Sequence, residues 1–146
     1  MTAKISFYGN PGNSLRAWCV LLVCFGSFAA LADVAFPKTD AIGQSAERLQ
    51  NWIQVPTNAV YPDSVQFDVK NGRIAGIVCE YSGKAINYPS VKAELQRVLS
   101  VEPRVSGTVT TAWRIEAKKC AVMLTLDEEK KVLRIIVRGF DEPDDK

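Results

Sequence analysis

The hydrophobic residues between Asp40 and Pro56 recur with the period of an α-helix. Apolar side chains stand three or four positions apart: Ile42, Ala46, Leu49 and Ile53. This spacing places them on one face of a helix. Asp40 is a favourable N-cap, and Pro56 is a residue that helix interiors exclude. We therefore expect a first helix that begins after Asp40 and ends before Pro56.

The pattern changes to alternation after residue 63, which is typical of a strand with one buried face. Three apolar residues alternate with polar ones: Val65, Phe67 and Val69. Asn71 and Gly72 follow, and they form the commonest two-residue hairpin turn because both tolerate positive φ. We expect a β-hairpin whose second strand covers residues 73–81.

A two-residue turn alone would leave the second strand of this hairpin facing the wrong way. It would turn three apolar residues toward the polar side: Ile77, Cys79 and Tyr81. One extra residue in that strand reverses the facing of everything after it, and glycine tolerates the bend. We therefore predict a β-bulge at Ala75-Gly76.

A second helix is predicted from Tyr88, with Pro89 in its first turn and an end before Pro103. Its apolar stripe has four members: Val91, Leu95, Val98 and Leu99. Three strands joined as a meander follow at residues 108–116, 120–126 and 132–139. The predicted order is α-ββ-α-βββ, which describes an α+β domain with helices packed on one face of an antiparallel sheet.

The pairing of the last three strands follows from side-chain facing, because a slip of one residue exchanges the two faces of a strand. Opposing Ile115 with Cys120, and Leu126 with Leu133, collects the apolar residues on a core face. That face contains Val109, Trp113, Ile115, Cys120, Val122, Leu124, Leu126, Leu133, Ile135 and Val137. Three rows form on the outer face: Arg114, Ala121 and Arg138; Ala112, Met123 and Ile136; Thr110, Thr125 and Arg134.

The first 32 residues have the order of a cleavable signal peptide, which is basic, then apolar, then small. Lys4 and Arg16 precede an apolar run over residues 17–32 that closes with Ala30, Leu31 and Ala32. Small residues at the third and first positions before the cut suit a signal peptidase, so we expect cleavage after Ala32. An uncleaved anchor is the alternative, although this run is shorter than the roughly 20 residues that span a bilayer.

Cleavage would change the charge of the protein. The whole chain has 18 Lys and Arg residues against 16 Asp and Glu residues. Residues 1–32 hold two of the basic residues and none of the acidic ones, so 16 of each remain. A neutral chain lacks the basic excess that binds a nucleic-acid backbone, so no nucleic-acid partner is expected. The remaining length suits one domain, residues 33–140, followed by an acidic C-terminal tail at 141–146.

Two of the four cysteines, Cys79 and Cys120, lie in the expected mature chain. An even number of cysteines in an exported protein favours a disulfide, and the predicted bulge and register turn both of them inward. We predict one disulfide between them, with two free thiols as the alternative. No N-glycosylation sequon follows Asp33, which favours a bacterial periplasm; release to the extracellular medium is the alternative.

The chain contains no histidine. This excludes Ser-His and Cys-His nucleophile pairs and removes the commonest transition-metal ligand. Two carboxylates could still catalyse hydrolysis, but the acids at 127–129 stand in a turn beside two lysines, and those at 141–145 stand in the tail. No phosphate-binding glycine loop or EF-hand spacing occurs, so no cofactor or metal is expected.

The outer face of the meander is the candidate binding surface, with five members singled out: Arg114, Arg134, Arg138, Met123 and Ile136. Arginine beside exposed apolar residues is typical of interfaces, and guanidinium groups bind carboxylates or phosphates bidentately. The alternative is an ordinary solvated face whose arginines pair with acids such as Glu116.

These features favour an exported, non-catalytic domain that binds a protein or an anionic envelope component. The alternative function is a histidine-free hydrolase that uses a carboxylate pair. Contact with the membrane is expected only through the signal peptide before its cleavage.

Overall fold

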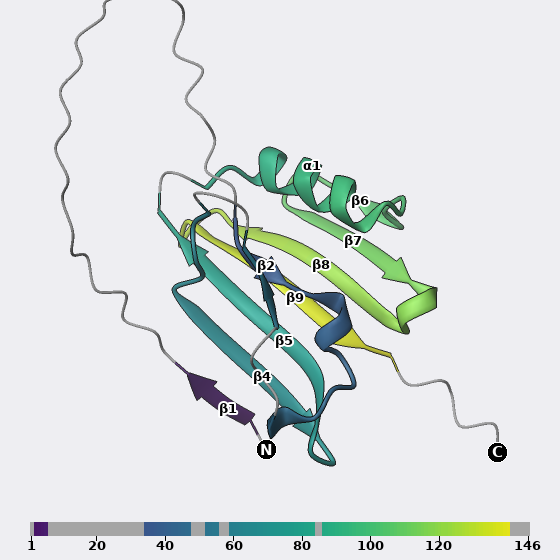
Figure 1. Ribbon diagram of the computed structural model, residues 1–146. Helices are drawn as coiled ribbons and strands as arrows, with labels where there is room; N and C mark the ends of the chain where they lie inside the picture. Colours follow the sequence, from purple (N-terminus) through teal and green to yellow (C-terminus); the bar gives the residue numbers. More distant parts are fainter. Residues whose placement is uncertain (1, 6–33, 48–51, 56–58, 84–85, 141–146) are drawn as a thin grey trace, which may run out of the picture.

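The computed structural model describes residues 2–5, 34–47, 52–55, 59–83 and 86–140 (Figure 1). An antiparallel sheet of seven strands has the order β1-β4-β5-β9-β8-β7-β6, and β2 and β3 form a second, two-stranded sheet. The strands are β1 (Thr2–Ile5), β2 (Phe36–Pro37), β3 (Ile53–Gln54), β4 (Ser64–Lys70), β5 (Arg73–Ser82), β6 (Val105–Ser106), β7 (Thr110–Ile115), β8 (Cys120–Asp127) and β9 (Val132–Gly139). The helical elements of the described ranges are the α-helix α1 (Tyr88–Leu99) and the 3-10 turns η1 (Thr39–Ala41) and η3 (Glu116–Lys118), and residues 46–47 are also in 3-10 conformation.

The hairpin of β4 and β5 contains the predicted bulge. Asp68 pairs with Gly76 whereas Val69 pairs with Ile74, so Ala75 is the extra residue of β5. Both turn residues adopt positive φ, 51° at Asn71 and 71° at Gly72. The bulge brings the apolar residues of both strands to one buried face: Val65, Phe67, Ile77, Cys79 and Tyr81.

The meander of β7, β8 and β9 has the predicted register. Ile115 pairs with Cys120, and Leu126 pairs with Leu133. Eight of the ten predicted core residues are buried: Trp113, Ile115, Cys120, Val122, Leu124, Leu133, Ile135 and Val137. Thr111 is also fully buried on this face, where its hydroxyl is 2.7 Å from the Tyr88 hydroxyl. That hydrogen bond offsets the cost of burying two polar groups.

Helix α1 begins where the sequence predicts. Asn87 is its N-cap, and the side-chain oxygen of Asn87 accepts a hydrogen bond from Ser90 N at 3.3 Å. Pro89 occupies the first turn, where a missing N–H costs nothing. The helix ends before the predicted limit because Ser100 adopts the left-handed conformation, with φ 52°.

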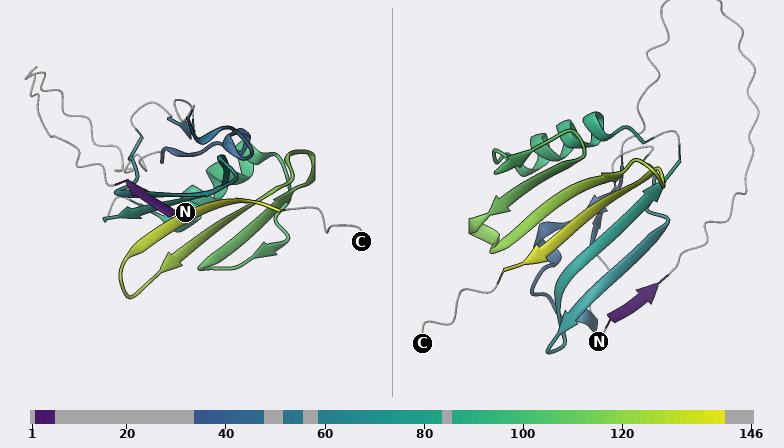
Figure 2. Two further views of the ribbon diagram at one scale, coloured as in Figure 1. Left: turned by 90° about the horizontal axis from the view of Figure 1, so that it is seen from below. Right: turned by 180° about the vertical axis from the view of Figure 1, so that it is seen from behind.

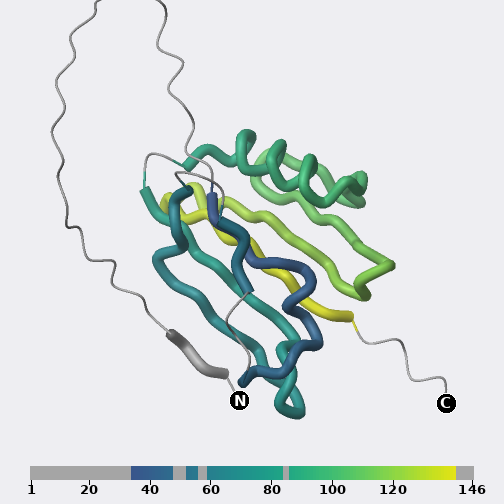
Figure 3. The backbone as a smooth tube through the Cα atoms, in the orientation of Figure 1, coloured from purple at the N-terminus to yellow at the C-terminus, as the bar shows by residue number. Residues whose placement is uncertain are grey.

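Two layers cover the same face of the main sheet, as the view from below in Figure 2 shows. Helix α1 packs over β6, β7 and β8, and Trp113 Nε1 donates to Gln96 Oε1 at 2.7 Å. The chain from Val34 to Glu47 covers β5 and β9 (Figure 3). There the Tyr81 hydroxyl donates to the carbonyl of Ala35. The core lies between these layers and the sheet.

The predicted first helix between Asp40 and Pro56 is wrong. Among the described residues of this range, helical conformation is limited to the 3-10 turn η1 and the 3-10 residues 46–47, and between them the chain runs along the start of β5. Gly43 N donates to Ile74 O at 2.8 Å, and Ala46 N donates to Gly72 O at 2.9 Å. These backbone groups pair with a neighbouring strand instead of within a helix, and Gly43 has φ 83°, which a helix cannot accommodate. Residues 48–51 lie outside the described residues.

The predicted disulfide between Cys79 and Cys120 is also wrong, and both cysteines are free and buried. Cys79 of β5 pairs with Ile135 of β9, whereas Cys120 of β8 pairs with Gly139 of β9. The cysteines are therefore four residues apart along β9, about 13 Å, and two strands apart across the sheet, about 10 Å. A disulfide requires Cα atoms within about 7 Å.

The fold class predicted from the sequence is corrected accordingly. The described residues form a mostly β protein with one α-helix, and the second covering layer is an extended segment rather than a helix. The described ranges contain no helix long and apolar enough to cross a membrane.

The predicted signal peptide is described only at Thr2–Ile5, which pairs with β4 as the edge strand β1. Cleavage after Ala32 would remove this strand and leave β4 at the edge of the sheet. The rest of the predicted signal and the predicted acidic tail lie outside the described residues.

Candidate binding face

An apolar row crosses the uncovered face of the sheet over five strands. The predicted row of Ala112, Met123 and Ile136 is in register, since each residue pairs with the next on the neighbouring strand. Ile136 also pairs with Val78 of β5, and Ala112 pairs with Val105 of β6. Opposed residues of an antiparallel pair share a face, so the apolar row consists of Val105, Ala112, Met123, Ile136 and Val78.

The sequence alone missed the two ends of the apolar row. Val78 could have been found, because the predicted bulge that turns Ile77 inward necessarily turns Val78 outward. Val105 had no such signal, because β6 is only two residues long. Its side chain is 55% exposed, which makes it the most solvent-accessible member of the apolar row.

Arg114 and Arg138 lie on one side of the apolar row, with Ala121 between them. The guanidinium of Arg114 bonds Glu116 Oε1 at 2.6 Å and stacks over the ring of Phe140 at 3.9 Å from its centroid. Within the described ranges Arg138 makes no ion pair, and its side chain is exposed. Arg138 is therefore the more available of the two for an acidic ligand.

Arg134 lies on the other side of the apolar row and is engaged within the protein. Its Nε donates to Glu80 Oε1 at 2.7 Å, and Glu80 Oε2 accepts from Ser64 Oγ at 2.9 Å. Both ion-paired side chains are about one-third exposed. The expected alternative, arginines paired with acids, thus describes Arg134 and Arg114 but not Arg138.

The structure brings together all five residues that the sequence assigned to this surface. They lie on three adjacent strands, β7, β8 and β9, and face away from α1. Figure 2 shows that neither α1 nor the segment 34–47 reaches this side of the sheet.

Comparison with protein-family models, curated proteins and solved structures finds no match for this chain. The interpretation of the face therefore depends on its own chemistry.

The acids that the sequence analysis weighed for a hydrolase lie at the β8–β9 turn and in the tail, and the tail is outside the described residues. In the turn at 127–129, Asp127 accepts from Lys130 N at 3.1 Å, and Glu128 and Glu129 are exposed to solvent. No group of three or more potential metal ligands occurs among the His, Cys, Asp and Glu residues of the described ranges.

Burial disfavours the thiolate form of both free cysteines. Burial raises the pKa of Cys79 to about 12, although a hydrogen bond with Tyr81 opposes that shift. Burial also raises the pKa of Cys120 above the usual value for a thiol. Because the thiolate is the reactive species, both side chains act as small apolar core residues at neutral pH.

Proposed function

We propose that this protein is an exported, non-catalytic interaction domain that binds a protein partner through the uncovered face of its main sheet. The observation that carries the proposal is the apolar row of Val105, Ala112, Met123, Ile136 and Val78. A continuous apolar row across five strands loses solvent contact when a partner covers it, and this is the main source of affinity in protein interfaces.

The arginines beside the apolar row suggest the character of the partner. Arg138, at its border, offers a guanidinium that makes no ion pair within the described ranges, and Arg114 offers one that is shared with Glu116. Arginine is enriched at interfaces and pairs bidentately with carboxylates. The partner surface that fits this face is therefore an apolar ridge with acidic residues on one side.

Met123 and Thr125 provide a matched pair of positions for testing this proposal. Both lie in β8 on the uncovered face and both are partly exposed, but only Met123 belongs to the apolar row. The wild type, Met123→Lys and Thr125→Lys would each be immobilised and offered the exported proteins of the source organism. We expect wild type and Thr125→Lys to retain the same partner and Met123→Lys to lose it. Equal retention by all three would show that the apolar row is not the binding site.

Export is tested separately, by the N-terminus of the protein recovered from outside the cytoplasm. We propose that the exported protein begins at Asp33, because Ala30-Leu31-Ala32 supplies the small residues before the cut. An intact mass that begins at Met1 would contradict both the cleavage site and the signal peptide.

A further inference from the structure

A second candidate site lies at the end of the sheet, outside the apolar row. It is a hollow of about 510 Å³ between the β4–β5 turn, the segment around Gly43, the β7–β8 turn and the end of β9. Six of its lining residues carry charge: Lys70, Arg73, Lys118, Lys119, Arg138 and Asp68. Five basic residues and one acidic residue thus line the hollow.

This concentration of charge stands out against the rest of the chain. Five of the 18 basic residues of the chain line one hollow, although residues 33–146 are neutral as a whole. Like charges repel one another, so a cluster of basic residues is stabilised by anions, as Lys118 is by Asp40. The positive potential of such a hollow attracts multiply charged anions.

The tertiary structure holds these cations in place. Arg73 Nη1 donates to the carbonyl of Gly43, a neutral acceptor, at 2.8 Å. Lys118 Nζ bonds Asp40 Oδ1 at 2.7 Å and Thr39 Oγ1 at 3.0 Å, which ties the β7–β8 turn to η1. Lys119 follows in the left-handed conformation, with φ 49°.

The hollow also has an apolar floor. Ile42, Ile74 and Phe140 line it together with the charged residues. Ile42 fits against Gly139, where an added Cβ would lie only 2.9 Å from Ile42 Cγ2. Apolar surroundings lower the local dielectric constant and strengthen the attraction between the cations and an anion.

We propose that this hollow binds a phosphate group that carries two or more negative charges. A compact polyanion can be reached by several lysines and by the forked donors of two arginines at once. A ligand with a single carboxylate carries only one negative charge and would interact with fewer of the five basic residues. The proposal does not rest on the function proposed for the apolar row, although Arg138 borders both sites.

The chain supplies a closely matched control for the test. Lys118 and Lys119 stand in the β7–β8 turn, whereas Lys130 and Lys131 stand in the β8–β9 turn at the other end of the strands. Each pair has one lysine that pairs with an aspartate, Asp40 or Asp127, followed by one lysine with φ near 50°. Replacing either pair by Gln and Asn removes the same charge from the same backbone conformation.

The experiment is calorimetric titration of the full chain with inorganic pyrophosphate. We expect Lys118→Gln with Lys119→Asn to weaken binding about tenfold or more, because two contacts to a charged group are lost. Lys130→Gln with Lys131→Asn should change it less than about twofold, since those residues are remote from the hollow. Arg138→Gln, an exposed strand position, should weaken binding independently if the first variant does not fold.

Three results would overturn the proposal. Absence of pyrophosphate binding both to wild type and to a variant that lacks residues 141–146 would show that no such site exists. Equal weakening of pyrophosphate binding by substitution of either lysine pair would indicate that pyrophosphate is attracted to the overall charge of the protein. Binding that emerges only after deletion of residues 141–146, which contain four acids, would make the chain's own tail the occupant.

A second experiment distinguishes a phosphate group on a lipid from one on a soluble compound. Vesicles of phosphatidylcholine with and without phosphatidic acid would be sedimented with the protein. Retention that requires phosphatidic acid, and that Lys118→Gln with Lys119→Asn abolishes, identifies a lipid headgroup. Pyrophosphate binding without such retention identifies a soluble phosphate compound. Since neither experiment uses the partner of the apolar row, failure here leaves the test with Met123→Lys unaffected.

Discussion

The two faces of the main sheet consist of alternate residues of the same strands, yet their side chains meet different surroundings. In β7, Trp113 is 1% exposed beneath α1, whereas the next residue, Arg114, has a side chain that is 41% exposed. In β5, Cys79 is fully buried, whereas Val78 lies in the apolar row. Stability therefore resides mainly on the covered face, whereas the uncovered face is the one that we propose to bind a partner.

The covered face is itself divided between two different layers. Helix α1 places Val91 and Leu95 over one half of the sheet, and the extended segment places Val34 and Phe36 over the other half. Both layers exclude water from apolar strand residues, which is what burial requires. An extended segment can therefore replace a helix, provided that its backbone groups find partners in the sheet or in neighbouring chain.

The largest contrast between the faces is expected at adjacent residues of β7. Trp113→Ala should lower the free energy of unfolding by about 3–5 kcal/mol, because it opens a cavity in the core and leaves Gln96 without its donor. Arg114→Ala should cost about 1 kcal/mol or less, because its ion pair with Glu116 is exposed. Urea unfolding of both variants measures the difference. Similar losses would mean that the two faces are not energetically distinct.

Thiol reactivity sharpens the same contrast in β5. At about pH 8, a pKa of about 12 reduces the thiolate fraction of Cys79 roughly a thousandfold relative to a thiol with the ordinary value of 9.0. We expect a thiol reagent to leave Cys79 unlabelled in the folded protein and to label it in urea. Val78→Cys, one residue away on the uncovered face, should react before unfolding. Peptide mapping locates the label, and rapid labelling of native Cys79 would contradict the burial.

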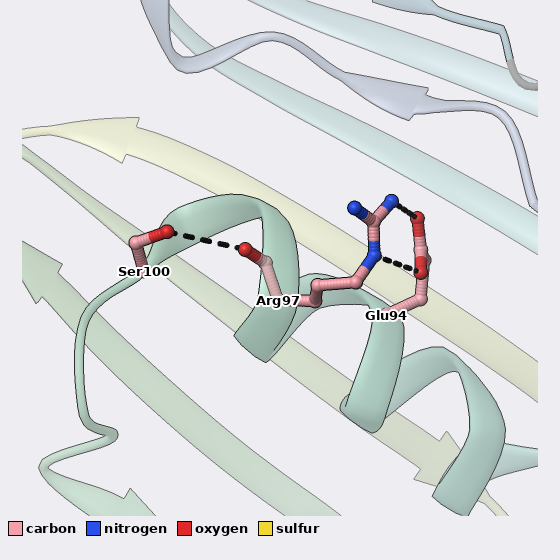
Figure 4. Close-up of polar contacts among 3 residues, drawn as sticks. All are labelled: Glu94, Arg97 and Ser100. Carbon is pink, nitrogen blue, oxygen red and sulfur yellow. Dashed lines mark hydrogen bonds and ion pairs between the residues drawn. The ribbon is translucent and has the colours of Figure 1, made fainter.

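The smallest effect is expected on the solvent side of α1. Figure 4 shows Arg97 bonded to Glu94, with Nη2 to Oε1 at 2.6 Å and Nε to Oε2 at 2.9 Å. The hydrogen bond from Arg97 lowers the pKa of Glu94. Glu94→Gln should cost about 0.3–0.5 kcal/mol at neutral pH, since solvent screens an exposed pair of this spacing.

The pH dependence of the Glu94 contribution has a definite sign. Because its pKa is lower in the folded state than in the unfolded state, the stabilisation is present above the unfolded value and is lost as the pH falls through the folded value. The difference in unfolding free energy between wild type and Glu94→Gln should therefore shrink toward acidic pH. A difference that grows with acidity would exclude the ion pair as its source.

Much of the candidate binding face could be predicted because strand pairing follows from local pattern. Alternation fixed which residues of β7, β8 and β9 share a face, and the five assigned residues do lie together. The hollow at the end of the sheet could not be predicted. Its cations come from three separate segments, the β4–β5 turn, the β7–β8 turn and the end of β9, and the segment around Gly43 bonds both Arg73 and, through Asp40, Lys118.

The sequence by itself determined the features that depend on neighbouring residues. The Asn71-Gly72 turn, the bulge at Ala75 and the cap of α1 at Asn87 all arise from local conformational preference and side-chain facing. The tertiary structure decided what depends on position within the sheet. Backbone bonds from β5 overrode the helical pattern after Asp40, and the offset of four residues along β9 keeps Cys79 and Cys120 apart. Periodicity carries no information about either, because each is set by strands that are distant in the chain.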